Sequence, residues 1–504
     1  MESVEVCECP GAKKRKLDVE PPTLPVEIWI GIFERLSAWQ LLRVRLVCQR
    51  WRDIVDGSRG LVAKFTVRFV PQFIDREYQP GHLFPAAKVF MKQVKIAAVG
   101  CWWVPFGAYL TDITLDECKI MLRNLLTMLR VTPNLKYLNL YDASVECHEA
   151  NPVPDFRLDK LETLCIDSVN REENLEVFRQ ICPNVKNLKI VTNYTSFHDQ
   201  LPFLRHVVDF VGVWNTSLEQ LETDGVDLML IELTQLPQWN LKGLILQGVE
   251  LENISSLINL CRLNPALEIL RVESAISCGP ELDEIGQLLP KLTNLMLTFK
   301  HRAEIQPTFL TPLAAGLRIL KLSAEDSEFQ IINFAGLECP HLQSLDLNGI
   351  HFDGHRLQTF LAGSPKLRIL SLTSCNFCCW RDLFRAIGTC KRILQHLCIS
   401  RVTVSQISSD HGFLDYLDEM RHLGLSGSKM SQEMVCTLLR LCPRLEVLHL
   451  QAMQLTDAEV VHVLCQKLRH LVRVKIENCA ISEQAINSIR QDCVVQQKLE
   501  IIEF

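Results

Sequence analysis

The sequence predicts an α/β solenoid, in which parallel strands line the inside of a curved, right-handed coil and helices cover its outside. An apolar pattern spaced L-x-x-L-x-L recurs along most of the 504 residues. Five successive copies begin at positions 267, 292, 317, 342 and 367, so the period is 25 residues. Between copies, segments such as residues 432–441 repeat apolar residues at helical spacing. A fixed period of this size indicates stacked units that share a continuous core.

A polar segment precedes the repeats. Residues 1–22 lack the apolar residues that a core needs, so we expect a disordered tail. A basic tetrad in this tail resembles a nuclear localisation signal, and the alternative is a solubilising charge run. We therefore expect the protein in the nucleus, the cytoplasm or both. The tetrad consists of Lys13, Lys14, Arg15 and Lys16.

Residues 23–60 predict three short helices. Pro25 suits the first turn of the first helix, and Glu27 lies favourably near its positive end. Ser37-x-x-Gln40 fits a capping box that opens the second helix, and Gly57 can close the third. A unit this short can bury only part of its apolar residues, so some of them remain available to another protein.

The apolar residues of these helices resemble the F-box motif in order and spacing: Leu24-Pro25-x-Glu27-Ile28, Ile32-Phe33-x-x-Leu36, Leu41, and Val47-Cys48-x-x-Trp51-Arg52. Gln40 departs from the family, which usually has an acidic residue there. The resemblance implies docking on a Skp-type adaptor and, through it, on a cullin and a RING subunit. The positions expected to form or support the adaptor contact are Leu24, Pro25, Ile28, Ile32, Leu36, Val47, Cys48 and Trp51.

A connector rich in proline and aromatic residues is expected over residues 61–90, and repeats over residues 91–504. The repeats resemble leucine-rich repeats and number about 15–17 units. A gap of 33 residues between Val185 and Leu218 predicts an inserted loop near residues 193–215. The candidate first positions of the pattern are Met91, Leu110, Leu135, Leu161, Val185, Leu218, Leu241, Leu267, Leu292, Leu317, Leu342, Leu367, Leu394, Met420, Leu445, Leu471 and Leu499.

Alternation along each strand sends the residues between the leucines to the concave face. Ile269, Ile319 and Ile369 fall there in one column, which suggests contact with an apolar partner or with the folded-back chain. Further along, histidines and cations gather on neighbouring strands and could bind an acidic or phosphorylated substrate segment, because Arg and protonated His favour anions. The alternative is a solvated polar face. These candidate substrate-binding residues are His396, His422, His449, Arg473 and Lys475.

The cysteines raise the question of a metal site. Cys375-x-x-Cys378-Cys379, with Cys390 and His396 downstream, has some of the residues that zinc requires. However, Cys375 and Cys390 occupy the same places in their repeats as Cys479 and Cys442. At such core positions a thiol acts as a small hydrophobe, so we expect no metal. The 21 cysteines, without an apolar leader segment, indicate reduced thiols.

Composition and missing motifs narrow the function. A net charge of −6 gives no basic field for nucleic acid, and the longest uncharged run, residues 96–110, is too short to span a membrane. No phosphate loop, dinucleotide fingerprint, serine elbow or HExxH occurs, so we expect no catalytic residue and no cofactor. The resemblance implies a substrate-recognition subunit of an SCF-type (Skp-cullin-F-box) ubiquitin ligase. The alternatives are a non-catalytic scaffold outside ubiquitination, and an enzyme with an unrecognised site within residues 191–215.

Overall fold

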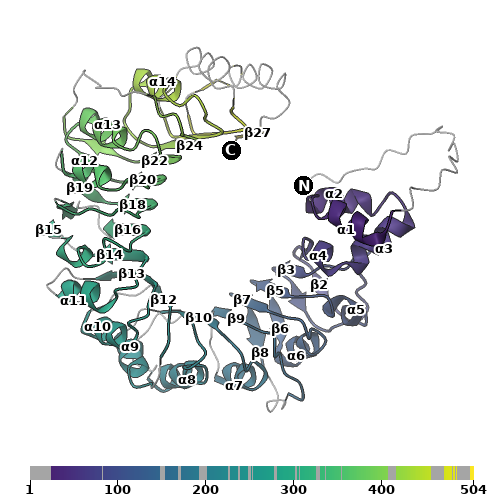
Figure 1. Cartoon of the computed structure of the whole chain (residues 1–504). Helices are drawn as coiled ribbons and strands as arrows, with labels where there is room; N and C mark the ends of the chain where they lie inside the picture. Colours follow the sequence, from purple (N-terminus) through teal and green to yellow (C-terminus); the bar gives the residue numbers. More distant parts are fainter. Residues whose placement is uncertain are drawn as a thin grey trace, which may run out of the picture.

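The computed structural model shows an open arc whose inner side is a parallel sheet and whose outer side carries helices (Figure 1). Thus the predicted fold class, an α/β solenoid behind a small helical unit, is confirmed. No helix in the described part of the chain has the length and apolar character needed to cross a bilayer. The structure describes residues 24–503 except 82, 148–153, 168–171, 192–200, 225–226, 237–238, 248–250, 252–253, 277–280, 301–303, 306, 325–329, 335, 353–354, 407–415, 454, 456–469, 480, 483 and 485–499.

The N-terminal unit consists of α1 (Val26–Phe33), α2 (Ala38–Val44), α3 (Gln49–Gly57) and the short α4 (Arg59–Val62). Pro25 lies at the N-cap of α1, one residue before the expected first turn. The capping box of α2 is present: Gln40 N donates to Ser37 Oγ at 3.3 Å, and Ser37 N donates to Gln40 Oε1 at 2.8 Å. Two orphan donors at the start of the helix are thereby satisfied.

Eighteen strands in the described part of the chain form the long sheet, and each pairs in parallel with the next along the arc. In chain order they are β1 (Thr66–Phe69), β3 (Lys88–Lys92), β5 (Asp112–Asp116), β7 (Tyr137–Tyr141), β9 (Thr163–Asp167), β10 (Asn187–Val191), β11 (Gln220–Asp224), β12 (Gly243–Gln247), β13 (Ile269–Ile276), β14 (Asn294–Phe299), β16 (Ile319–Ala324), β18 (Ser344–Asn348), β20 (Ile369–Thr373), β22 (His396–Ser400), β24 (His422–Ser426), β25 (Val447–Gln451), β26 (Arg473–Glu477) and β27 (Glu500–Glu503).

Helices cover the outer side, and they are α5 (Trp103–Gly107), α6 (Leu122–Arg130), α7 (Glu172–Ile181), α8 (Leu201–Gly212), α9 (Asp227–Leu233), α10 (Ile254–Leu263), α11 (Glu281–Leu288), the 3₁₀ helix η1 (Pro307–Leu310), α12 (His355–Ala362), α13 (Trp380–Gly388) and α14 (Gln432–Arg440). Two sheets of short strands lie beside the long one: β2 (Phe73–Ile74), β4 (Lys95–Ile96), β6 (Lys119–Met121) and β8 (Ser144–Glu146), and then β15 (Glu304–Ile305), β17 (Gln330–Ile332), β19 (Ile350–Phe352), β21 (Asn376–Phe377) and β23 (Thr403–Val404).

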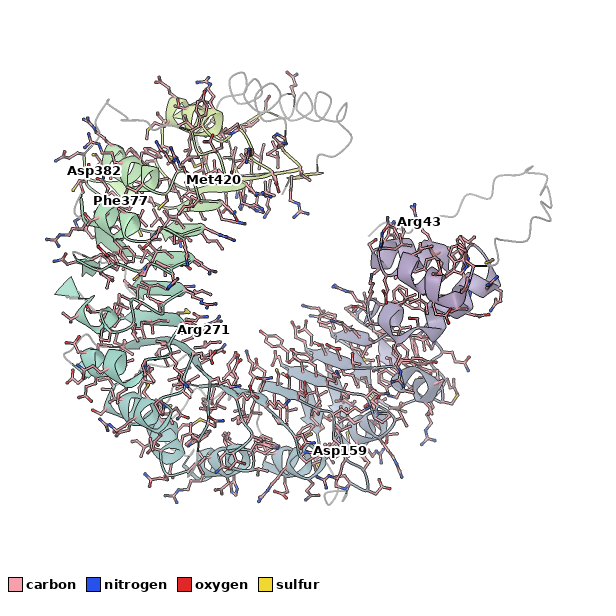
Figure 2. All side chains as sticks on the ribbon, in the orientation of Figure 1. Arg43, Asp159, Arg271, Phe377, Asp382 and Met420 are labelled. Carbon is pink, nitrogen blue, oxygen red and sulfur yellow. The ribbon has the colours of Figure 1, made fainter. Side chains whose placement is uncertain are left out.

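The leucines of the repeated pattern are the core. Leu342, Leu345 and Leu347, for example, are fully buried, as are their counterparts in neighbouring repeats. From Leu110 to Leu471, each expected first position lies two residues ahead of a strand of the long sheet. The intervening residues face the inside of the arc, where Figure 2 shows Arg271 of β13, whereas Asp382 of α13 lies outside.

The connector expected over residues 61–90 is wrong, because its first strand already belongs to the solenoid. β1 pairs in parallel with β3, with Phe69 opposite Met91, so the long sheet begins at Thr66. Met91 is consequently the third apolar position of its repeat, and Ala86, which is buried, is the first. Alanine at that place and proline nearby hid the pattern from a search for leucines.

The prediction of an inserted loop near residues 193–215 is also wrong, because most of this segment is helical. Residues 201–212 form α8, which packs between α7 and α9, and β10 pairs directly with β11. The longer gap therefore holds a helix of the ordinary outer layer. Residues 192–200 lie outside the described residues.

A left-handed residue follows many strands of the long sheet directly. Gly349 (φ 71°), Ser374 (φ 49°) and Arg401 (φ 50°) are three consecutive cases. Each donates its backbone N–H to the last strand residue of the next repeat; Gly349 N reaches Thr373 O at 2.9 Å and Ser374 N reaches Ser400 O at 2.8 Å. The turn thus extends the strand pairing by one bond and sends the chain from the inner sheet toward the outer layer.

Substitutions at different positions of this turn should change the free energy of unfolding by different amounts. At Gly349 a Cβ would lie 3.0 Å from Ala324 Cβ in addition to the positive φ, so we expect Gly349→Val to destabilise its repeats by about 2–3 kcal/mol. Ser374→Gly should be neutral or stabilising by up to about 1 kcal/mol, because glycine tolerates that φ. Chemical denaturation measures both. Equal midpoints for Gly349→Val and the wild type would contradict the strain argument.

Candidate binding surfaces

The N-terminal helices expose apolar side chains on their outside. Ile28, Ile32 and Val47 are 50%, 42% and 62% exposed, and Leu24 and Pro25 are also exposed. Inside, Trp29, Phe33 and Leu41 are buried. Each turn of α1 therefore divides its apolar residues between the core and solvent. Apolar side chains that cluster in solvent mark a contact surface.

Three of the expected contact residues lie deeper. Leu36, Cys48 and Trp51 are half-buried. The Trp51 ring lies 4.9 Å from that of Trp29 and 5.5 Å from that of Phe33, measured between centroids. Trp51 therefore belongs to the interior of the unit as much as to its surface, and it supports the exposed residues by fixing α3 against α1.

The sequence interpretation missed three exposed apolar residues: Val26, Trp39 and Leu46. Leu46 is 78% exposed, and it precedes Val47 in the turn between α2 and α3. The motif gives no signal for it, because its four parts do not include position 46. The guanidinium of Arg43 lies 4.8 Å from the Trp39 ring and covers part of that side chain.

The N-terminal unit is fixed to the solenoid by direct contacts. Lys64 Nζ donates to Glu34 O at 2.6 Å and to Leu36 O at 2.8 Å, which ties the end of α1 to the chain entering β1. Arg45 forms a bidentate pair with Asp56, and its guanidinium lies 5.0 Å from the Phe84 ring. The core of the unit is thus continuous with that of the first repeats.

These observations define a class: an N-terminal F-box-like domain followed by a leucine-rich-repeat solenoid. The family model described as F-box-like matches residues 22–61, the segment that carries the exposed apolar side chains. Modules of both kinds are generally non-catalytic and bind other proteins.

Among solved structures, the chain is similar to a leucine-rich-repeat protein of Leptospira interrogans, with 18% identity over 83% of this chain and 90% of that chain, and a TM-score of 0.41. So distant a likeness carries no functional argument. A search of curated proteins finds no match.

On the concave face, the predicted substrate residues separate into two groups. His396 and His422 pair across β22 and β24, with their rings stacked 4.1 Å apart. His449 and Lys475 instead both contact Glu477: His449 Nε2 lies 2.9 Å from Glu477 Oε2, and Lys475 Nζ lies 2.7 Å from Glu477 Oε1. The two contacts lower the pKa of Glu477, so its carboxylate offsets the positive charge that the sequence suggested. Arg473 lies beside Val447 in the register of β25 and β26.

The stacked histidines border a small hollow of about 220 Å³. Its floor is low because Ser371, Cys398 and Gly424 follow one another across three strands, and none carries a large side chain. Burial lowers the pKa of His396, and the charges of His422 and Arg421 lower it further, while Glu446 acts in the opposite direction. His396 therefore favours its neutral state, which suits an apolar or uncharged polar group in the hollow.

The exposed isoleucines are placed as expected. Ile319 and Ile369 are 40% and 42% exposed on the concave face, with Ser344 between them, and Ile269 is half-buried. Ile369 also lines the hollow beside His396. In this column isoleucines alternate with Asn294 and Ser344, and the column ends at the histidine pair.

Of the cysteine cluster, Cys375 and Cys390 lie in the repeat core, whereas Cys378 and Cys379 are half-buried. Cys375 is buried, its thiol donates to Leu347 O at 3.3 Å, and burial raises its pKa to about 12. Cys118 occupies the same place in an earlier repeat and donates to Met91 O at 3.3 Å. Within the residues that the structure describes, no three His, Cys, Asp or Glu side chains are placed to hold a metal. Cys375 thus packs as a small apolar side chain.

Loss of the Trp51 ring should loosen the F-box-like domain itself. Because Trp51 packs on Trp29 and Phe33, we expect Trp51→Ala to destabilise α1 and α3 by about 2–3 kcal/mol, less than a fully buried tryptophan would. Hydrogen–deuterium exchange of the two helices measures this. Val47→Ala, at an exposed position, serves as the control and should leave exchange unchanged. Unchanged exchange in Trp51→Ala would show that the ring contributes little inside the domain.

The titration of His396 should depend on the ring stacked against it. We expect His422→Gln to raise the pKa of His396 toward its ordinary value of 6.5, because a neighbouring charge is removed. In the wild type, the unfolded chain takes up a proton at higher pH than the native state does. Stability should therefore fall as pH drops below 6.5. NMR titration of labelled histidines tests both statements, and an unchanged His396 pKa in the variant would refute the coupling.

Proposed function

We propose that this chain is the substrate-recognition subunit of an SCF-type ubiquitin ligase. The observation that supports the proposal most is the exposed apolar surface of the F-box-like domain, formed by Leu24, Ile28, Ile32 and Val47. F-box domains generally bind Skp1-type adaptors, and apolar surface of this kind needs a protein partner. The solenoid then provides the concave face that holds a substrate.

Such a subunit acts by proximity. A substrate held on the solenoid stays close to the conjugating enzyme that the adaptor, cullin and RING subunit bring, which raises the effective concentration of its lysines. The receptor needs no catalytic residue for this. The direct join between the F-box-like domain and β1 supports the role, because it fixes where the bound substrate lies relative to the adaptor.

Gln40 does not argue against adaptor binding. Its side chain accepts from Ser37 N and completes the capping box, so this departure from the family pattern keeps α2 in place. Gln40 therefore gives no support to the competing function, a scaffold outside ubiquitination, which becomes an outcome of the test.

Co-purification with a Skp-type adaptor tests the proposal. We expect Ile28→Asp and Val47→Asp each to reduce captured adaptor by more than about tenfold, because a buried unpaired charge at an interface costs more than about 1.4 kcal/mol. Val104→Asp, an equally exposed valine on α5, is the matched control and should leave capture unchanged. A folded wild-type chain that captures no adaptor would refute the ligase role. Capture without ubiquitin transfer to any bound protein would favour the scaffold.

For the substrate face, we propose the strip from Ile369 through His422 to Lys475 on the concave sheet. Interaction mass spectrometry of the wild type against His422→Ala/His449→Ala/Lys475→Ala identifies partners that need this face. Proteins lost only from the triple variant are substrate candidates, whereas an unchanged set would exclude the face.

We also propose that the basic tetrad at residues 13–16 directs the chain to the nucleus. These residues lie outside the described part of the structure, so the sequence alone supports this. Changing all four to alanine should move a fluorescent fusion toward the cytoplasm.

A further inference from the structure

A larger cavity lies where the F-box-like domain meets the solenoid. Its volume is about 780 Å³, within the range of small-molecule sites. Arg59, Val62 and Ala63 of the α4 region form one side, and the residues just before β3 and β5, Ala87 and Thr111, form another. The remaining walls come from the end of α5 and from the turns that lead into β7 and β9.

The cavity is lined by three cations and no carboxylate: Arg59, Lys136 and Lys160. Lys160 Nζ donates to the neutral amide of Asn134 at 2.7 Å. Among the described residues, Arg59 and Lys136 have no acidic side chain within ion-pair distance. All three side chains are solvent-exposed, and together they give the cavity a positive lining that favours an anion.

Three later repeats differ from this one at the place that Lys136 occupies, one residue before the strand, because they pair the cation there with an acid of the neighbouring repeat. Lys186 lies 3.1 Å from Glu162, Lys242 lies 2.8 Å from Glu219, and Arg421 lies 3.2 Å from Glu446. Two others, with Arg318 before β16 and Arg368 before β20, have no acid beside the cation in the strand register. Beside Lys136, Thr111 supplies no acid on one side, and on the other side Glu162 is bound to Lys186.

Apart from the polar Thr111 and Asn134, the remaining lining is apolar or aromatic. Val62, Pro105, Ala108 and the half-exposed Tyr109 face the same space as the cations. A ligand that fits both parts has one anionic group and an adjoining apolar or aromatic portion. The anionic group would accept from Lys136, Lys160 and Arg59, which suit phosphate and carboxylate oxygens.

We propose that this cavity is a binding site for a small organic anion, a phosphate or carboxylate attached to an apolar or aromatic group. Because its walls come from both α4 and the first repeats, the ligand would join the F-box-like domain to the solenoid. Binding to the native state alone would then stabilise the junction.

Ligand-observed NMR with phenyl phosphate and benzoate, at low ionic strength, tests the proposal on the full chain, with benzyl alcohol as the neutral counterpart. For so small a probe we expect saturable binding with a Kd of about 1 mM or tighter. The two anions distinguish phosphate from carboxylate as the preferred group. Benzyl alcohol should bind at least about tenfold more weakly.

Variants locate the binding. Lys136→Gln/Lys160→Gln should weaken phenyl phosphate binding by about tenfold, and Ala108→Phe, which fills the cavity without changing charge, should weaken it similarly. Lys242→Gln, which removes a cation from the equivalent place in a later repeat, is the control and should change Kd by less than about twofold. Absence of saturable binding by both anions would overturn the proposal, as would equal binding of benzyl alcohol or an equal loss in Lys242→Gln.

Discussion

Burial of the L-x-x-L-x-L side chains between the inner sheet and the outer helices is the interaction on which the rest of the structure depends. No single repeat can remove these side chains from water, since one strand and one helix leave two flanks open. Leu345 and Leu347 are buried because β16 and β20 lie on either side of β18. At the N-terminal end, Leu61 and Phe65 continue the same core, so the F-box-like domain closes the flank of the first repeat.

The sequence predicts this architecture well because the leucines that repeat along it are the same side chains whose burial stabilises the fold. Leucines two residues before a strand locate nearly every strand of the long sheet. The leucine pattern fails to locate a repeat where a residue other than leucine fills the buried position. Ala86 begins a repeat whose start is expected at Met91, and α8 fills a gap that is expected to be a loop. Both errors arise because the spacing of leucines along the sequence does not show which residues pack against each other in the folded chain.

The binding surfaces are harder to predict because they depend on register between repeats. Alternation places His449 and Lys475 on the concave face, but only the structure shows that Glu477 contacts both of them. The hollow beside His396 requires Gly424, Cys398 and Ser371 to fall in one row, and no local motif marks that row. The cavity beside α4 joins residues more than 100 positions apart, from Arg59 to Lys160. Motif spacing identified Ile28 and Ile32 as exposed residues of α1, since one helix contains both, although it missed Val26.

The join between α4 and β1 has a geometric consequence for anything carried on the arc. Lys64 is hydrogen-bonded to the end of α1, so the F-box-like domain and the solenoid meet without a hinge. The position of each repeat is therefore fixed relative to the F-box-like domain. A point on the concave face is separated from the F-box-like domain by a set number of strands, and each added strand moves it by one increment of translation and rotation. Gain or loss of a repeat during evolution would therefore change the position and orientation of a bound partner by a discrete step. A longer flexible linker would only broaden the range of positions that the partner reaches.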